Sequence, residues 1–145
     1  MSKPAHAFVV DASVVVESLL DLKLARSATE FFRRAAREGR ELWAPDLIYL
    51  ETLSSLRKLE GRGLIPAAVA SAAVDDLLRL PLQTVGTGAL VLEVWRLRGH
   101  ISPYDASYLA LAGHLDCEFV TADARLARAA PGFRVRLLTP TAASE

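Results

Sequence analysis

Residues 102–123, with the sequence SPYDASYLALAGHLDCEFVTAD, predict an apolar helix followed directly by a short buried strand. Ser102 is a suitable N-cap, because its hydroxyl can accept a hydrogen bond from a free backbone amide of the first turn. Pro103 suits the first helical position, where no N–H group is needed. The stretch therefore places two acids, Asp105 and Asp123, at the ends of elements, where the loops of α/β proteins build functional sites.

The composition predicts a single domain spanning residues 1–145. A chain of 145 residues is about the size of one domain and can bury a substantial core. Hydrophobic residues make up 52% of the chain, which argues against disorder and fits helices covering both faces of a sheet. Lys plus Arg and Asp plus Glu both number 17, so an overall positive charge is not available for binding nucleic acid.

The sequence also indicates where the protein works. Its single cysteine, Cys117, excludes an intramolecular disulfide and a cysteine-based zinc site. No signal peptide is visible at residues 1–7, and no uncharged run approaches the roughly 18 residues that a membrane helix needs. We therefore expect a cytoplasmic protein with no membrane association.

Short apolar runs alternate with helical patterns along the chain. Residues 7–10 are fully apolar, which is typical of a strand buried on both faces. Residues 14–20 predict a short helix, although their three valines would equally suit a strand. This order predicts an α/β fold with an open, mostly parallel sheet of about five strands, covered by helices on both faces. We expect strands at 7–10, 41–44, 82–85, 118–121 and 134–138, further helices at 24–38, 47–60, 89–98 and 123–130 and one opening at Pro66, and a loose tail at 139–145.

Four acids stand where such a sheet would bring them together. Asp11 and Asp123 follow strands, and ligands of open parallel sheets bind beyond the carboxyl ends of the strands. Glu51 and Asp105 lie in the N-terminal parts of helices, which begin at the same edge. Four close carboxylates repel one another strongly and need a cation to stay ionised. An all-oxygen set suits Mg²⁺ or Mn²⁺, which activates water toward a phosphate group.

Each acid also has a purely structural interpretation. Asp11 and Asp123 are suitable N-caps for the helices that follow them. Asp105, three residues after Ser102, fits a capping box, and Glu51 fits a solvated helix surface. A cap and a metal ligand are compatible roles, since the helix dipole favours a carboxylate at the helix start. Spacing alone leaves both interpretations open.

Four motifs resemble those of the PIN domain family. They are FVVDASV at 8–14, ETLSSLRKL at 51–59, SPYDASYLALA at 102–112 and TADARLA at 121–127, in the order and at the size of the stand-alone toxins called VapC. The third motif is the most specific of the four. The resemblance implies a three-layer α/β/α sandwich and a Mg²⁺- or Mn²⁺-dependent endoribonuclease site. Its acids correspond to Asp11, Glu51, Asp105 and Asp123.

The resemblance has further implications for partners and supporting residues. It implies a homodimer and a cognate VapB-like antitoxin that holds the toxin inactive. Thr121 matches the small hydroxyl residue that usually precedes the last acid, and we expect Ser13 to support the same site. Ser54 departs from the pattern, because the family often has Asn after the helix Glu.

An RNA substrate requires cations near the acids. Arg57 and Lys58 follow Glu51 on its helix, and Arg125 follows Asp123, so these three are candidates for contacts with RNA phosphates. Solvated helix faces explain each of them equally well. Aromatic residues on apolar stripes usually belong to the core rather than to a base-stacking surface. We therefore expect Phe31, Phe32, Trp43 and Trp95 in the core.

Three other functions fit parts of the pattern. A PIN-like domain that no longer cuts RNA would act only through its partner, although all four acids are present. A phosphoaspartate receiver would have paired acids after the first strand, whereas Ala12 follows Asp11. A phosphatase with an Asp-x-Asp nucleophile is disfavoured by Ser13. We expect an RNA-cleaving toxin, with a catalytically silent, partner-binding domain as the alternative.

Overall fold

The computed structural model describes residues 6–141, which contain a five-stranded sheet whose strands are all parallel. The spatial order of the strands is β3-β2-β1-β4-β5. Each strand lies within one residue of its expected ends, so the predicted, mostly parallel sheet of about five strands is confirmed. The strands are β1 (Ala7–Val10), β2 (Glu41–Pro45), β3 (Leu82–Val85), β4 (Glu118–Thr121) and β5 (Val135–Leu137).

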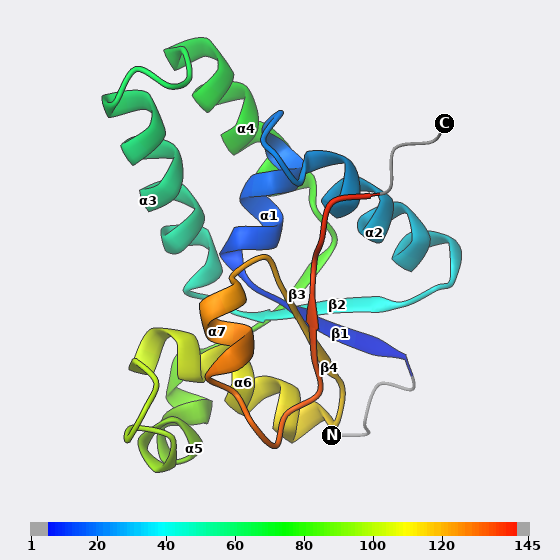
Figure 1. The fold of residues 1–145 in the computed structure, drawn as a ribbon, viewed down its shortest axis with the longest axis vertical. Helices are drawn as coiled ribbons and strands as arrows, with labels where there is room; N and C mark the ends of the chain where they lie inside the picture. Colours follow the sequence, from blue (N-terminus) through cyan, green and yellow to red (C-terminus); the bar gives the residue numbers. More distant parts are fainter. Residues whose placement is uncertain (1–5, 142–145) are drawn as a thin grey trace.

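Helices cover both faces of this sheet (Figure 1), as expected for a three-layer α/β/α sandwich. The helices are α1 (Ala12–Leu19), α2 (Ala25–Arg37), α3 (Ile48–Gly61), α4 (Ala67–Arg79), α5 (Val91–Arg96), α6 (Pro103–Leu115) and α7 (Ala124–Arg128). Helices α1 and α2 lie on one side of the sheet, and α5 and α6 lie on the other. Helices α3 and α4 form a pair that projects from the body of the domain.

Helix caps explain where several of these elements begin. The Ser102 hydroxyl accepts a hydrogen bond from the N–H of Asp105 at 3.2 Å, as predicted for the start of α6. Asp11 caps α1 by accepting from the N–H of Val14 at 3.2 Å, and this cap favours a helix at the valine-rich segment. The helix expected at 89–98 forms instead as a 3₁₀ turn, η1 (Thr87–Leu90), followed by the short α5.

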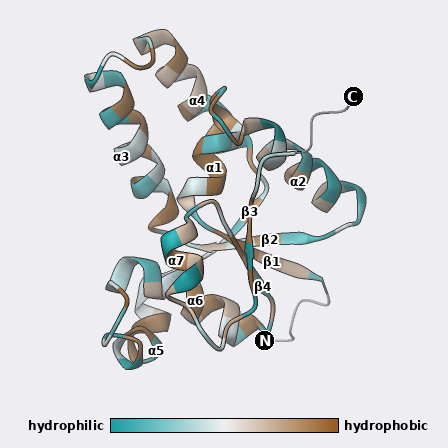
Figure 2. Ribbon diagram, viewed as in Figure 1, coloured by the Kyte–Doolittle hydropathy of each residue, from teal (hydrophilic) through white to brown (hydrophobic). Residues whose placement is uncertain are grey.

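The core lies around the two central strands and α6. Val9 and Val10 of β1 and Phe119 and Val120 of β4 are all 0% exposed. Residues 106–112 of α6 are buried on every side of the helix, because α6 packs between β1, β2, β4 and α5. A helix that is apolar all round is stable only in such a position. The hydropathy colouring agrees, with brown along α6 and teal patches on the outer helix α2 (Figure 2).

The parallel register brings two of the predicted acids to one place. Val10 of β1 pairs with Val120 of β4, so Asp11 and Thr121 follow at neighbouring positions. Helices α1 and α7 both begin at this edge, and their N-caps are Asp11 and Asp123. One acid therefore lies just beyond the end of β1 and one just beyond the end of β4, at the same edge of the sheet.

The chain after β5 has no regular structure through residue 141. The Ser27 hydroxyl of α2 donates a hydrogen bond to the carbonyl oxygen of Thr139 at 2.6 Å, which ties the start of the expected loose tail to the domain. Residues 142–145 of that tail lie outside the described residues. No helix in the described part of the chain combines the length and the hydropathy needed to cross a membrane.

Candidate active site

One pocket at the carboxyl edge of the sheet is lined by all four acids that the sequence singles out. Asp11 enters it from the end of β1, and Asp123 from the loop before α7. Glu51 and Asp105 enter it from the first turns of α3 and α6. The pocket has a volume of about 250 Å³, and its other lining residues are Ala12, Ser13, Ser54, Ser55, Lys58 and Tyr108.

Asp11 is the most deeply buried of the four acids, with 6% of its surface exposed. Its Oδ1 accepts hydrogen bonds from the Ser13 hydroxyl at 2.5 Å and from the N–H of Val14 at 3.2 Å, and its Oδ2 accepts from the Thr121 hydroxyl at 2.6 Å. Burial raises the pKa of Asp11 to about 6, although these three hydrogen bonds act in the opposite direction. The carboxylate is therefore held in one orientation, but its ionisation is unfavourable without a cation.

Two hydroxyl groups connect Asp11 to the segment that carries Asp123. The Ser13 hydroxyl oxygen accepts from the N–H of Ala122 at 2.9 Å, and the Thr121 hydroxyl oxygen accepts from the N–H of Asp123 at 3.0 Å. Each hydroxyl thus donates to Asp11 and accepts from the neighbouring loop. Ser13 and Thr121, which we expected to support the acids, are in direct hydrogen-bond contact with one of them.

Glu51 is held by Tyr108, which the sequence pattern of α6 does not mark as a functional residue. The Tyr108 hydroxyl donates a hydrogen bond to Oε1 of Glu51 at 2.6 Å. Burial raises the pKa of Glu51, the Tyr108 hydrogen bond lowers it, and the charge of Asp105 raises it. Burial and the Glu51 carboxylate also raise the pKa of Tyr108, so the phenol remains a proton donor. Tyr108 resembled an ordinary apolar position of α6, and its place one turn after Asp105 was the available signal.

A single guanidinium group lies beside the two remaining acids. Nη2 of Arg125 is 3.6 Å from Oδ2 of Asp105 and 3.6 Å from Oδ2 of Asp123. Burial raises the pKa of Asp105, and the charge of Arg125 lowers it. Oδ1 of Asp123 accepts from the N–H groups of Arg125 and Leu126 at 2.9 and 3.2 Å, so the cap of α7 and the ion pair use different oxygens.

The donor set suits a hard divalent cation held partly through water. Within residues 6–141, no three acidic, histidine or cysteine side chains are arranged closely enough to hold a metal by themselves. Mg²⁺ usually keeps several waters and takes only one or two carboxylates together with substrate phosphate oxygens. The negatively charged groups that line the pocket are all carboxylates, its histidine- and cysteine-free lining adds only hydroxyl oxygens and the Lys58 amine, and the hydrogen bonds to the buried Asp11 all come from neutral groups. These residues therefore fit Mg²⁺ or Mn²⁺.

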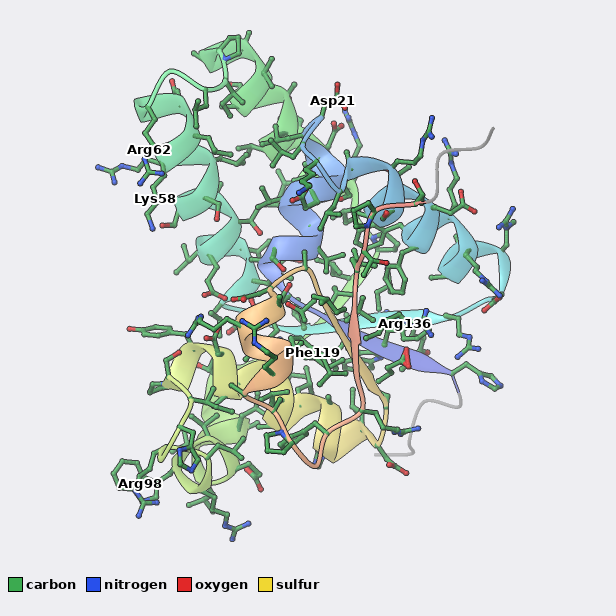
Figure 3. All side chains as sticks on the ribbon, in the orientation of Figure 1. Asp21, Lys58, Arg62, Arg98, Phe119 and Arg136 are labelled. Carbon is green, nitrogen blue, oxygen red and sulfur yellow. The ribbon has the colours of Figure 1, made fainter. Side chains whose placement is uncertain are left out.

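The three candidate RNA contacts lie differently around the pocket. Lys58 lines it, Arg125 pairs with two of its acids, and Arg57 is exposed on α3 without lining it. Figure 3 shows Lys58 and Arg62 projecting from the same side of α3. Lys58 is thus the cation best situated to meet a phosphate group in the pocket.

The aromatic residues expected in the core differ in their exposure. Phe31 is buried, and Phe32 and Trp43 are partly buried against the core. Trp95 is 63% exposed, so the prediction is wrong for this residue. Val94 of α5 and Leu97, which caps its C-terminal end, pack against the core, and Trp95 lies on the exposed side of the helix.

Comparison with known proteins shows similarity over most of the chain. Residues 8–131 match the family model described as PIN domain. The chain is 37% identical over 118 residues to the VapC ribonuclease Mb0985 of Mycobacterium bovis, covering 81% of this chain and 87% of that protein. It is 32% identical over 131 residues to the ribonuclease VapC3 of Mycobacterium tuberculosis, covering 90% of this chain and 92% of that protein.

The fold is also similar to that of solved structures. The crystal structure of VapBC2 from Rickettsia felis, bound to a DNA fragment from its promoter, superposes with a TM-score of 0.64. The match covers 92% of this chain and 99% of that chain at 13% sequence identity. At this identity the likeness supports the fold alone.

The buried carboxyl of Asp11 predicts an unusual dependence of stability on pH in the metal-free protein. Its pKa is raised from 3.8 to about 6 on folding, so the folded state binds the proton more tightly than the unfolded state. The contribution of Asp11 to the free energy of unfolding therefore falls as the pH rises from about 4 to about 6, and is constant above that. Asparagine does not titrate in this range. Between pH 4 and pH 7 the free energy of unfolding of Asp11→Asn should therefore fall by on the order of 2 to 3 kcal/mol less than that of the wild type.

Urea unfolding in the presence of EDTA, from about pH 4 to pH 7, measures the effect. Any hydrogen bond that the amide loses shifts all the values alike and leaves the slope with pH unchanged, so the slope is the quantity to compare. Asp21→Asn, in the exposed turn after α1, is the matched control and should keep the wild-type slope. An unchanged slope in Asp11→Asn would contradict the raised pKa.

Proposed function

The chain belongs to the PIN domain family, and from this membership we infer that it is an endoribonuclease toxin that hydrolyses RNA with a divalent metal ion. Its similarity to proteins named VapC ribonucleases, over most of both chains, supports ribonuclease activity. The observation that carries the proposal is the convergence of Asp11, Glu51, Asp105 and Asp123 on one pocket. Carboxylates collected in this way fit a metal-dependent phosphodiesterase better than a purely structural role.

In the proposed mechanism, each acid has a place around the ion. Asp11, Asp105 and Asp123 would hold Mg²⁺ or Mn²⁺, directly or through water, with Glu51 completing the ring. When bound, the ion lowers the pKa of a water molecule and neutralises charge on the scissile phosphate. The Ser13 and Thr121 hydroxyls keep the Asp11 carboxylate turned in one direction.

Removal of the metal or of one acid tests this mechanism. We expect excess EDTA to abolish RNA cleavage and Mg²⁺ or Mn²⁺ to restore it. Asp105→Asn should lower the rate by more than the roughly 10- to 100-fold typical of residues that act behind a metal ligand. The measurement is the initial rate of cleavage of a fluorescently labelled RNA, with Asp21→Asn as the control. Figure 3 shows Asp21 at the far end of α1 from the pocket.

Two outcomes would contradict the proposal. Cleavage that persists in EDTA, or at the wild-type rate in Asp105→Asn, would exclude the metal mechanism. A protein that binds its antitoxin but cleaves no RNA with either metal would instead favour a catalytically silent domain that acts through its partner.

The proposal includes contacts between basic residues and RNA phosphates. Each phosphate contact contributes a release of counterions, so binding weakens as the salt concentration rises. Lys58 lines the pocket, and we expect Lys58→Ala in the inactive Asp105→Asn protein to weaken RNA binding and to reduce the salt slope by about 1. Arg33→Ala, on the exposed side of α2, is the matched control.

Fluorescence anisotropy at several salt concentrations supplies both quantities. The same measurement applies to Arg57→Ala and Arg125→Ala. In the Asp105→Asn background the guanidinium group of Arg125 still pairs with Asp123. Arg125→Ala therefore removes a cation and also leaves this carboxylate unpaired, and both changes should weaken RNA binding. An unchanged affinity and slope in Lys58→Ala would exclude that residue from the RNA path.

We also propose a VapB-like antitoxin and a homodimer as the partners. The antitoxin is supported by the similarity to proteins named VapC ribonucleases. The homodimer is supported by the exposure of large apolar side chains on α5, where Val91, Leu92 and Trp95 are 59%, 68% and 63% exposed beside an apolar groove. Clusters of this kind commonly mark interaction surfaces.

A charge on this surface tests the dimer. We expect the wild-type protein to sediment with the mass of a dimer and Trp95→Glu with the mass of a monomer, because the glutamate would have to be buried in the interface without a partner. Leu78→Glu, at a 73% exposed position of α4, is the control for an added charge at an apolar surface residue. Analytical ultracentrifugation that returns the same mass for Trp95→Glu and the wild type would exclude α5 as the interface.

A further inference from the structure

Tyr108 connects the core of the protein to the acidic pocket. It lies in α6 and is 1% exposed, and its ring packs on Phe119 with a centroid separation of 6.0 Å. Its hydroxyl donates to Oε1 of Glu51 at 2.6 Å, so the contact joins α6 to α3. The backbone N–H of Ala12, the first residue of α1 and the neighbour of Asp11, also lies against the phenol oxygen and lowers the pKa of Tyr108. One buried side chain therefore touches the elements that carry Asp11, Glu51 and Asp105.

The four acids are held in place by different means. Asp11 accepts from two hydroxyls and a backbone amide, and Asp123 accepts from two amides at the start of α7. Asp105 lies opposite Arg125. Glu51 has a longer side chain than these aspartates, and within residues 6–141 its carboxylate receives a hydrogen bond from Tyr108 alone. Tyr108 is therefore the group on which the placement of Glu51 depends.

The local electrostatics would otherwise move Glu51 away from the pocket. The negative charge of Asp105 acts unfavourably on Glu51, and Glu51 is only partly buried, so solvent is within reach of its carboxylate. A flexible glutamate beside a like charge gains both hydration and rotamer freedom by turning outward. A short hydrogen bond from a buried, immobile phenol opposes this movement, since its donor is fixed by the packing of α6.

We propose that Tyr108 is a positioning residue that holds Glu51 at the metal pocket. The hydroxyl engages Oε1 and leaves Oε2 without a hydrogen bond from the described residues. The inference rests on the proposed function, because it assigns Tyr108 a role through a carboxylate that completes the metal site. Residues that orient metal-binding side chains in this way commonly change metal affinity when they are replaced.

Metal binding by the protein alone tests the inference without relying on cleavage. We expect Tyr108→Phe, which keeps the ring and removes the hydroxyl, to weaken Mn²⁺ binding by about tenfold in isothermal titration calorimetry. Glu51→Gln should weaken it at least as much. In the double variant, Tyr108→Phe should cause no further loss, because Tyr108 acts only through the Glu51 carboxylate. Tyr104→Phe, at an exposed position of the same helix, is the matched control and should bind Mn²⁺ like the wild type.

A second variant approaches the same contact from the other side. Glu51→Asp keeps the charge but withdraws the carboxylate from Tyr108, so it should reproduce the loss caused by Tyr108→Phe even if the latter variant folds poorly. Thermal unfolding of each variant in EDTA shows whether the fold is retained. Further weakening by Tyr108→Phe in the Glu51→Gln background would indicate a general structural role and overturn the inference.

The remaining outcomes separate this inference from the proposed function. Wild-type Mn²⁺ affinity in a folded Tyr108→Phe variant would overturn the role of Tyr108 while leaving the metal site in place, whatever the affinity of Glu51→Asp. Loss of binding in Asp11→Asn with wild-type binding in Glu51→Gln would remove Glu51 from the site, and the inference with it. Wild-type binding in Asp11→Asn as well would contradict the proposed metal site itself.

Discussion

The hydrogen bonds from Ser13 and Thr121 to Asp11 join the ends of the two central strands, and the rest of the pocket depends on them. Strands β1 and β4 are neighbours, so the residue after β1 meets the last residue of β4. The Thr121 hydroxyl is fully buried, and it donates to Asp11 and accepts from the N–H of Asp123. A buried hydroxyl without hydrogen bonds is unfavourable, so the bonds that satisfy this one also set the relation between two acids. The pairing of β1 with β4 therefore also determines the geometry of the pocket.

The pocket gathers negative charge at a cost to the metal-free fold. Burial makes ionisation of Asp11 unfavourable, and Glu51 and Asp105 show the same effect in a milder form. Neutral donors and one guanidinium group, that of Arg125, offset part of this cost. A cation that binds the folded protein and not the unfolded chain would stabilise the fold by mass action. The same carboxylates therefore link the chemistry of the site to the stability of the domain.

Helix α6 serves both the core and the pocket. Its residues 106–112 are buried on all sides, so the helix cannot shift without disturbing the sheet beneath it. Its first turn remains at the surface, where Ser102 caps it and Asp105 faces the pocket. Tyr108, one turn further in, lies at the boundary between the two regions. A rigid core helix with a polar start gives the pocket a wall that moves little.

The order of the strands along the chain, the parallel sheet and the meeting of four acids at one edge of the sheet could be predicted from the sequence, because they follow from local signals. Apolar runs, helix caps and the residues that end each strand are properties of short segments, and motifs spaced along the chain carried the family resemblance. The contact of Tyr108 with Glu51, the pairing of Arg125 with two acids and the exposure of Trp95 were not predictable in this way. Each depends on how helices distant in the sequence pack against one another, and no local pattern records which side of a helix its neighbours will cover.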